Sequence, residues 1–251
     1  MERTLLLPLL LAIAGAVVGS FIGLTSLRLP KREQIVLGRS RCSSCAKPLG
    51  PVDLVPLLSF LALRGRCRRC GATIEKRYPL IEAASALIGF ASGLAYSDSQ
   101  ALAASVLGWW LLLLGLLDFE HYWLPNRLTY PLILLGLAAT AWLQPMLLLH
   151  NIIGAGAGFA LLSGMAAGYR KLRRRHGLGG GDAKLFAAAG AWLGWYTLPF
   201  VLLGSAVAAL AVALAMPRRG GAFLVQRLPF GAFLAPAIWI LYLVRPGSWP
   251  G

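Results

Sequence analysis

The chain has 251 residues, of which 58% are hydrophobic and only 13% are charged. Soluble globular domains carry about 25% charged residues, so this composition excludes an ordinary soluble domain and indicates an integral membrane protein. The net charge of +15 suggests nucleic acid as a partner, but the positions of the charges, described below, favour membrane topology as the cause.

Eight apolar segments have about the length that a helix needs to cross a bilayer, which is about 20 residues. The sixth is short, and we expect it to be tilted, partly re-entrant or continuous with the seventh. The glycines of 154–158 suit close approach between helices. The first segment starts like a signal peptide but continues to about Leu27, so we expect an uncleaved spanning helix. The predicted fold is an all-α membrane protein with about eight transmembrane helices, at about 5–27, 79–97, 101–118, 127–143, 149–169, 182–196, 198–216 and 229–245.

Basic residues gather in alternate connections between these segments. If eight helices alternate in direction, 22 of the 24 Lys and Arg residues lie on one side, and only Arg3 and Arg245 lie on the other. Positive loops face the cytoplasm, so we expect both ends of the chain to face outward. Nucleic-acid binding by the first loop is an alternative, but topology explains the charge more simply, and we expect no nucleic-acid partner.

All four cysteines lie in the one sizeable polar segment, residues 28–78, as the pairs Cys42/Cys45 and Cys67/Cys70 with 21 residues between them. Two CxxC pairs place four thiolates around one tetrahedral ion, the closed geometry of a structural zinc site. Disulfides and unrelated free thiols are the alternatives; a cytoplasmic loop disfavours disulfides, and about 50 residues form too small a core to fold unaided. The predicted domains are a first transmembrane helix (1–27), a small cytoplasmic zinc-binding loop domain (28–78) and a seven-helix membrane domain (79–251).

Asp118 and Asp182 each adjoin a long apolar segment, where a charged group is costly and is by default a functional candidate. Counting helices places both on the cytoplasmic face. Asp182 follows a run of glycines that includes Gly179 and Gly181, and such residues allow close backbone approach. Lys184 either balances the charge or extends to the interface. Two carboxyl groups at the ends of separate helices are the minimum for acid–base hydrolysis.

These residues carry a resemblance to a known family. Gly179-x-Gly181-Asp182 with Lys184 resembles the second catalytic motif of the type IV prepilin peptidases, which are intramembrane aspartyl proteases. Asp118 with Leu124-Pro125-Asn126 resembles their first motif, and the paired cysteines are similar to their cytoplasmic zinc domain. Further stretches match in order: Gly19-Ser20-Phe21, Arg28-Leu29-Pro30, 53–59, 63–67, 77–82 and 228–231. The chain departs from the family pattern at Gly23 and Ser43, where many members carry Asn and Pro. If these differences affect an activity, that activity is methyl transfer.

The resemblance implies an endopeptidase of the bacterial inner membrane that removes the short basic leader from prepilins or pseudopilins at the cytoplasmic face. Asp118 and Asp182 would share a proton and activate a water molecule as a coupled pair. The resemblance also implies N-methylation of the new N-terminus with S-adenosylmethionine, although the sequence does not place the residues that bind this cofactor. A peptidase without methyl transfer is the main alternative. A transporter or scaffold with a zinc docking loop is a remoter one, because it does not explain why both aspartates gather at one face.

Overall fold

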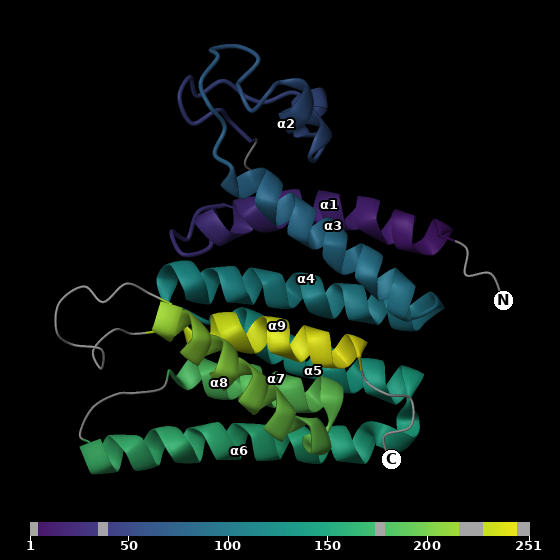
Figure 1. Ribbon diagram of the computed structural model, residues 1–251, viewed down its shortest axis with the longest axis vertical. Helices are drawn as coiled ribbons and strands as arrows, with labels where there is room; N and C mark the ends of the chain where they lie inside the picture. Colours follow the sequence, from purple (N-terminus) through teal and green to yellow (C-terminus); the bar gives the residue numbers. More distant parts are fainter. Residues whose placement is uncertain (1–4, 35–39, 174–178, 216–227, 245–251) are drawn as a thin grey trace. The chain divides into compact units, whose positions relative to one another are not determined.

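The computed structural model describes residues 5–34, 40–173, 179–215 and 228–244, and its regular elements within them are helices (Figure 1). Helices suit a bilayer because they satisfy their backbone polar groups internally. Five helical stretches in this part of the chain are long and apolar enough to cross a membrane: Leu6–Arg28, Arg77–Ala95, Asp98–His121, Pro145–Leu172 and Trp195–Ala215. The predicted all-α membrane fold is therefore confirmed.

Each of the eight predicted segments contains a helix. These are α1 (Leu6–Arg28), α3 (Arg77–Ala95), α4 (Asp98–His121), α5 (Asn126–Leu143), α6 (Leu148–Arg173), α7 (Gly180–Leu193), α8 (Leu198–Ala215) and α9 (Phe230–Leu243). A short helix α2 (Leu58–Ala62) and three 3-10 turns, η1 (Pro51–Leu54), η2 (Pro145–Leu147) and η3 (Trp195–Thr197), complete the described elements. Because α7 and α9 have only 14 residues each, eight full spans stay a prediction.

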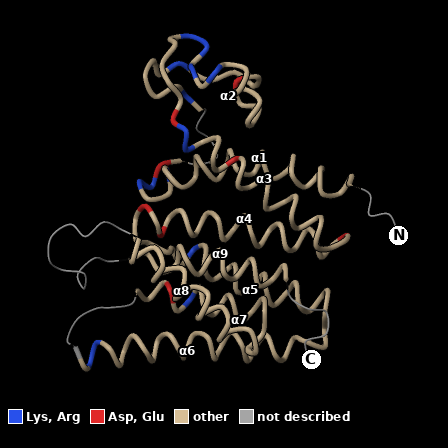
Figure 2. The backbone as a smooth tube through the Cα atoms, in the orientation of Figure 1, with Lys and Arg blue, Asp and Glu red and all other residues tan. Residues whose placement is uncertain are grey.

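Some of the residues used to predict the side of each loop lie outside the described ranges. They are Arg3, Arg39, Arg174, Arg175, Arg218, Arg219, Arg227 and Arg245, together with Gly177 and Leu178 of the glycine-rich stretch. In the described residues, Lys and Arg (blue in Figure 2) are frequent along the polar segment between α1 and α3. The predicted side of each loop stays an expectation.

The chain forms two compact units, Met1–Trp109 and Trp110–Gly251, and the boundary between them falls inside α4. In the first unit α1 packs along α3. Close approach depends on small residues, because a Cβ on Gly15 would meet the backbone of Ser85, and a Cβ on Gly89 would meet the backbone of Leu11. The polar segment that holds the cysteines connects these two helices.

In the second unit α7 is the central helix. Eleven of its 14 residues are buried, and it packs against α5, α6, α8 and α9. Beyond its first turns α7 is apolar on every face, which is typical of a helix that neighbouring helices cover. The predicted close approach through 154–158 is confirmed for Gly154 and Gly158, which contact α7 backbone at Gly190 and Phe186, whereas Gly156 has no such neighbour.

Candidate functional site

Asp118 lies in the last turn of α4, which continues three residues beyond the predicted end of that segment. Its side chain is buried, with 6% of the residue exposed. Asp118 Oδ2 accepts a hydrogen bond of 3.0 Å from the backbone N–H of Ala232. Ala232 is the third residue of α9, so the carboxyl group of Asp118 caps a helix N-terminus, where free N–H groups and the helix dipole stabilise negative charge.

Asp182 is the third residue of α7 and is also buried, with 7% exposed. Its Oδ2 atom accepts a hydrogen bond of 3.3 Å from the N–H of Gly179, and its own N–H donates to the carbonyl of Gly179 at 3.2 Å. The side chain therefore closes the first turn of its own helix, as a residue at this position of a capping box does. Gly179, which belongs to the glycine run before Asp182, is the partner in both bonds.

The two carboxyl groups meet at the start of α9. The backbone N–H of Gly231 interacts with both, and the charge of Asp118 acts on Asp182. A Cβ on Gly231 would lie 2.8 Å from Asp118 Oδ2, so only glycine allows the backbone to approach so closely. Side chains 64 positions apart in sequence are thus brought to one place by the ends of three helices.

Leu124 packs between the start of α7 and the start of α9. This residue is buried, and a Cβ on Gly181 would lie 2.7 Å from Leu124 Cβ, while a Cβ on Gly231 would lie 2.9 Å from Leu124 Cδ1. Leu124 therefore contacts the second residue of α7 and the second residue of α9 at once. This contact gives Gly181 a physical reason to lack a side chain.

Lys184 bonds to the first residue of α5, two positions after Leu124. Its Nζ atom donates a 2.6 Å hydrogen bond to Asn126 Oδ1 and lies 5.3 Å from the ring centroid of Tyr130. The distance suits a cation–π contact. Charge balance and extension to the interface stay predictions for Lys184. The contact joins the two sequence motifs directly.

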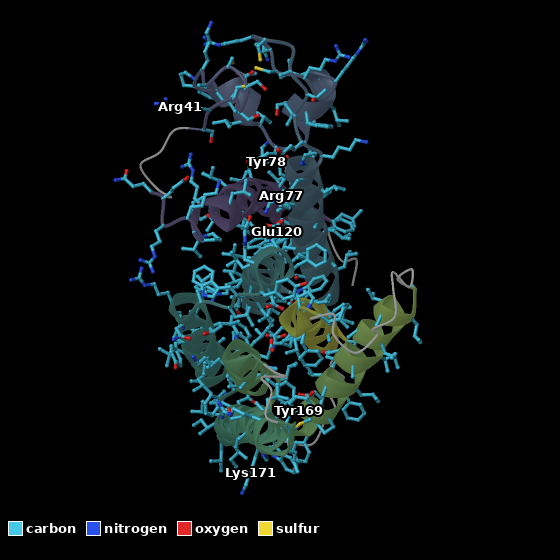
Figure 3. All side chains as sticks on the ribbon, turned by 90° about the vertical axis from the view of Figure 1, so that its left-hand side faces the viewer. Arg41, Arg77, Tyr78, Glu120, Tyr169 and Lys171 are labelled. Carbon is cyan, nitrogen blue, oxygen red and sulfur yellow. The ribbon has the colours of Figure 1, made fainter. Side chains whose placement is uncertain are left out.

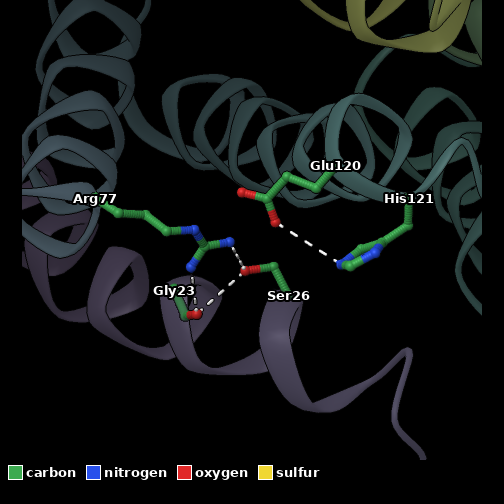
Figure 4. A network of polar contacts seen from close by, with 5 residues as sticks. All are labelled: Gly23, Ser26, Arg77, Glu120 and His121. Carbon is green, nitrogen blue, oxygen red and sulfur yellow. Dashed lines mark hydrogen bonds and ion pairs between the residues drawn. The ribbon is translucent and has the colours of Figure 1, made fainter. Parts of the chain in front are cut away.

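Figure 4 shows two further polar groups, each within its own unit. In the first unit Arg77 donates to the carbonyl of Gly23 at 3.1 Å and to Ser26 Oγ at 2.8 Å, which holds the start of α3 against the end of α1. In the second unit His121 Nε2 lies 3.9 Å from Glu120 Oε2, at the end of α4. The Glu120–His121 pair is partly exposed, unlike Asp118.

The four cysteines form the predicted cluster. Their sulfur atoms all lie within 4.8 Å of one another, and Cys42 Sγ lies 3.8 Å from Cys70 Sγ. Four sulfurs at the usual 2.3 Å from one zinc ion would lie about 3.8 Å apart, so the donor set fits a tetrahedral ion. Figure 3 shows the sulfur atoms (yellow) gathered in the segment that also holds Arg41. No cysteine of the cluster forms a disulfide.

The chemistry of the thiols also suits a cation. Backbone N–H groups of Cys45 and Ser44 lower the pKa of Cys42 to about 6. The pKa of Cys70 is raised to about 11: the N–H of Ala72 lowers it, but loss of solvent and the three neighbouring sulfurs outweigh that effect. One thiolate therefore forms readily, whereas the full set of thiolates needs a positive ion at the centre.

The two cysteine pairs have the same backbone geometry. Ala46 N–H donates to the carbonyl of Cys42, and Gly71 N–H donates to the carbonyl of Cys67, both at 2.9 Å. Ala46 and Gly71 have positive φ values of 54° and 72°. Each pair thus ends in a left-handed residue that turns the chain back, which lets both thiols of a CxxC pair face the same point.

Two charged residues hold the rest of this segment in place. Asp53 Oδ1 accepts a 2.8 Å hydrogen bond from Arg68, and this guanidinium lowers the pKa of the Asp53 carboxyl group. Glu82 of α3 is buried, and its Oε2 atom accepts a 2.8 Å bond from the N–H of Leu57. The second bond fastens the cysteine-bearing segment to the membrane helix.

The sequence alone did not identify some of these residues as parts of the site. Ala232 acts only through its backbone N–H, and Gly231 and Leu124 appear in the sequence only as parts of longer matching stretches. The start of α9, as distinct from its apolar length, is marked in the sequence by Pro229, since proline commonly stands at a helix start. Glu82 likewise matched only as part of a longer stretch, and its bond to a backbone N–H leaves no trace in residue types.

Two family models match the chain. The bacterial peptidase A24 N-terminal domain matches residues 13–96, which include the four cysteines, and the type IV leader peptidase family matches residues 105–214, which include both aspartates. No solved structure matches the chain.

Curated proteins match over most of the chain. A prepilin leader peptidase/N-methyltransferase of Burkholderia pseudomallei (strain K96243) is 44% identical over 82% of this chain and 67% of its own length. One from Aeromonas hydrophila is 38% identical over 83% of this chain and 72% of its own. A type 4 prepilin-like proteins leader peptide-processing enzyme of Escherichia coli O78:H11 is 35% identical over 91% of both chains.

Proposed function

The chain belongs to the type IV leader peptidase family, and from this premise we propose that it is a prepilin leader peptidase and N-methyltransferase of a bacterial inner membrane. Its substrates are prepilins or pseudopilins with a short basic leader before a hydrophobic helix. The observation that supports the peptidase site most strongly is the meeting of two buried carboxyl groups, from α4 and α7, at the first turn of α9. Membership of this family also disfavours the transporter and scaffold alternatives.

In the proposed reaction Asp118 and Asp182 share one proton. Two carboxyl groups so close do not both ionise readily, and the pair retains a single negative charge. The N–H groups of Gly231 and Ala232 stabilise this charge at the start of α9. Burial excludes competing water and strengthens these interactions.

The ionised carboxylate takes a proton from a bound water molecule as the water oxygen attacks the scissile carbonyl carbon. The protonated carboxyl group gives its proton to the carbonyl oxygen, and a tetrahedral diol forms. The C–N bond then breaks and the leader leaves as a carboxylic acid. In this step a hydroxyl group of the diol returns its proton to the ionised carboxylate, and the protonated carboxyl group gives its proton to the amine nitrogen of the mature pilin. No covalent enzyme intermediate is needed, so neither Ser nor Cys takes part as a nucleophile.

We infer that Cys42, Cys45, Cys67 and Cys70 hold a structural Zn²⁺ ion. Their spacing fits four-coordinate zinc, and all four positions are protein ligands, so the ion would stabilise the segment and leave no open position for substrate. S-adenosylmethionine would supply the methyl group for the second activity. No residues are assigned to its binding.

We place the cysteine segment and both aspartates on the cytoplasmic side. This orientation rests on the excess of basic residues in the loops. It agrees with the substrate, because a basic leader stays in the cytoplasm while the hydrophobic helix that follows lies in the membrane.

One assay tests the two activities together. Purified full-length protein in bilayers is incubated with a synthetic prepilin and labelled S-adenosylmethionine, and cleavage and label transfer are measured on the same sample. We expect both, and the Asp118→Asn variant should perform neither on uncleaved substrate. Cleavage without label transfer would support the peptidase alone, and no cleavage would refute the proposal.

A further inference from the structure

Five large apolar side chains are exposed between residues 52 and 61, in the part of the polar segment that separates the two cysteine pairs. They are Val52, Leu54, Val55, Leu58 and Leu61, here called the apolar edge. Leu58 is 66% exposed and Leu61 is 70% exposed. Both lie on α2, three residues apart, so they share one face of that helix. An apolar group of this density outside a membrane span indicates a surface that something covers.

The bond between Leu57 and Glu82 sets the depth of this edge along α3. Glu82 lies five residues inside α3, which is about 7.5 Å along the helix axis from Arg77. The N–H of Leu57 is 2.8 Å from the Glu82 carboxylate, and α2 begins at the next residue. Within the first unit, the start of α2 is therefore bonded to the second turn of α3.

This depth matches the boundary of a bilayer. Helix α3 is long and apolar enough to cross a membrane, and its polar end begins at Lys76 and Arg77. Amphipathic helices bury their apolar face about 5–10 Å into the boundary between headgroups and acyl chains. A helix fixed beside Glu82 lies in that range.

The charges around the apolar edge suit anionic lipid. Arg64, Arg66, Arg68 and Arg69 follow α2, and all four are exposed. Within residues 51–76 the acidic residues are Glu75 and Asp53, and the latter is bonded to Arg68. Basic side chains next to inserted apolar residues attract phosphate headgroups, at about 1 kcal/mol each near an anionic surface.

We propose that α2 and the apolar edge insert into the bilayer surface and that the four arginines bind anionic phospholipid headgroups. The cysteine segment is then a membrane-seated module and not a free cytoplasmic loop. Lipid is the favoured occupant because the Glu82 bond holds the edge at membrane depth whether or not a substrate is present. This proposal does not depend on the peptidase reaction.

Site-specific photocrosslinking tests the proposal on the full chain. A benzophenone amino acid replaces Leu58 or Leu61, and the purified protein is irradiated in nanodiscs of phosphatidylethanolamine and phosphatidylglycerol. The matched control carries the same residue at Ser44, which is exposed in the first cysteine pair. Zinc content confirms that each variant is folded. Mass spectrometry should find several-fold more lipid adducts at positions 58 and 61 than at 44.

The contrary results are distinct. Equal lipid adducts at all three positions would overturn the proposal. Adducts at 58 and 61 that form only on an added synthetic prepilin would identify the substrate as the occupant and overturn it as well. Replacing phosphatidylglycerol by phosphatidylcholine should reduce the adducts, and unchanged adducts would refute headgroup recognition by the arginines.

Discussion

The cysteine cluster and the aspartate pair are held in opposite ways. The cysteines lie in two short turns of one polar segment, and each turn orients its own thiols. The aspartates come from α4 and α7. A backbone N–H of α9 donates to Asp118, and the N–H of Gly179, just before α7, donates to Asp182. The first arrangement is local, whereas the second depends on the packing of three helix ends.

This difference predicts different roles for the two groups: the cysteines stabilise the protein, and the aspartates carry out the reaction. Four thiols that converge on one point leave no position for a substrate and suit a structural ion. Two buried carboxyl groups that meet at the start of a helix suit proton transfer. Damage to the cysteines should therefore act on stability first, and damage to the helix ends should act on the reaction first.

The largest effect is expected from removing either carboxyl charge. Asp118→Asn and Asp182→Asn should each lower leader cleavage by roughly 10²–10⁴-fold, the usual contribution of general acid–base catalysis. The measurement is the initial rate on a synthetic prepilin in bilayers. Asp98→Asn, at the other end of α4 and exposed, is the matched control and should keep the normal rate. A normal rate in either site variant would remove that aspartate from the mechanism.

A smaller but still large effect is expected at Gly231. In Gly231→Ala the new Cβ would lie 2.8 Å from Asp118 Oδ2, and a shift of about 1 Å in a catalytic group costs about 10²-fold in rate. Gly204→Ala on α8 is the control, because a Cβ there has no neighbour within 4 Å. Equal rates for the two variants would show that α9 does not position the pair.

Loss of the metal should affect the two regions unequally. Cys42→Ser should reduce zinc from about one ion per chain and lower the thermal unfolding temperature, while cleavage measured below that temperature falls much less than in the aspartate variants. Ser43→Ala, in the same turn, is the control for metal content by elemental analysis. Unchanged zinc would refute the ligand assignment, and a loss of cleavage equal to Asp118→Asn would refute the separation of the two regions.

The smallest effect is expected at the Lys184–Asn126 contact. A hydrogen bond to a charged group at a partly exposed position contributes about 1 kcal/mol, so Lys184→Met should lower the cleavage rate about fivefold. Lys184→Arg keeps a donor, so its cleavage rate should fall less. The cleavage rate of Asn126→Ala should fall as much as that of Lys184→Met, and the rate of the double variant should be no lower than that of either single variant. Additive losses would show that the two residues act separately.

Sequence patterns predict local features well in this molecule. The spacing of the four cysteines is enough to predict their cluster, because each CxxC pair forms its own turn. The helices of the membrane units follow from apolar segment length, since a bilayer requires this secondary structure. Asp118 and Asp182 stand out because a charge beside an apolar segment is rare.

Contacts between residues that are far apart in the sequence are harder to predict from the sequence. The donor from Ala232 to Asp118 is a backbone group, which no side-chain pattern reveals. Leu124 acts through its shape between two glycines, and an isolated leucine in an apolar chain gives no signal. Lys184 and Asn126 lie 58 positions apart, and only the packing of α5 against α7 brings them together.

The most direct test of the central claim uses a prepilin peptide that carries a hydroxyethylene group in place of the scissile amide. If Asp118 and Asp182 act together on one water molecule and one carbonyl group, this hydroxyl group binds between them as a transition-state analogue. It should then inhibit cleavage at least about 10²-fold more strongly than the same peptide without the hydroxyl group. Equal inhibition by the two peptides would contradict a catalytic aspartate pair.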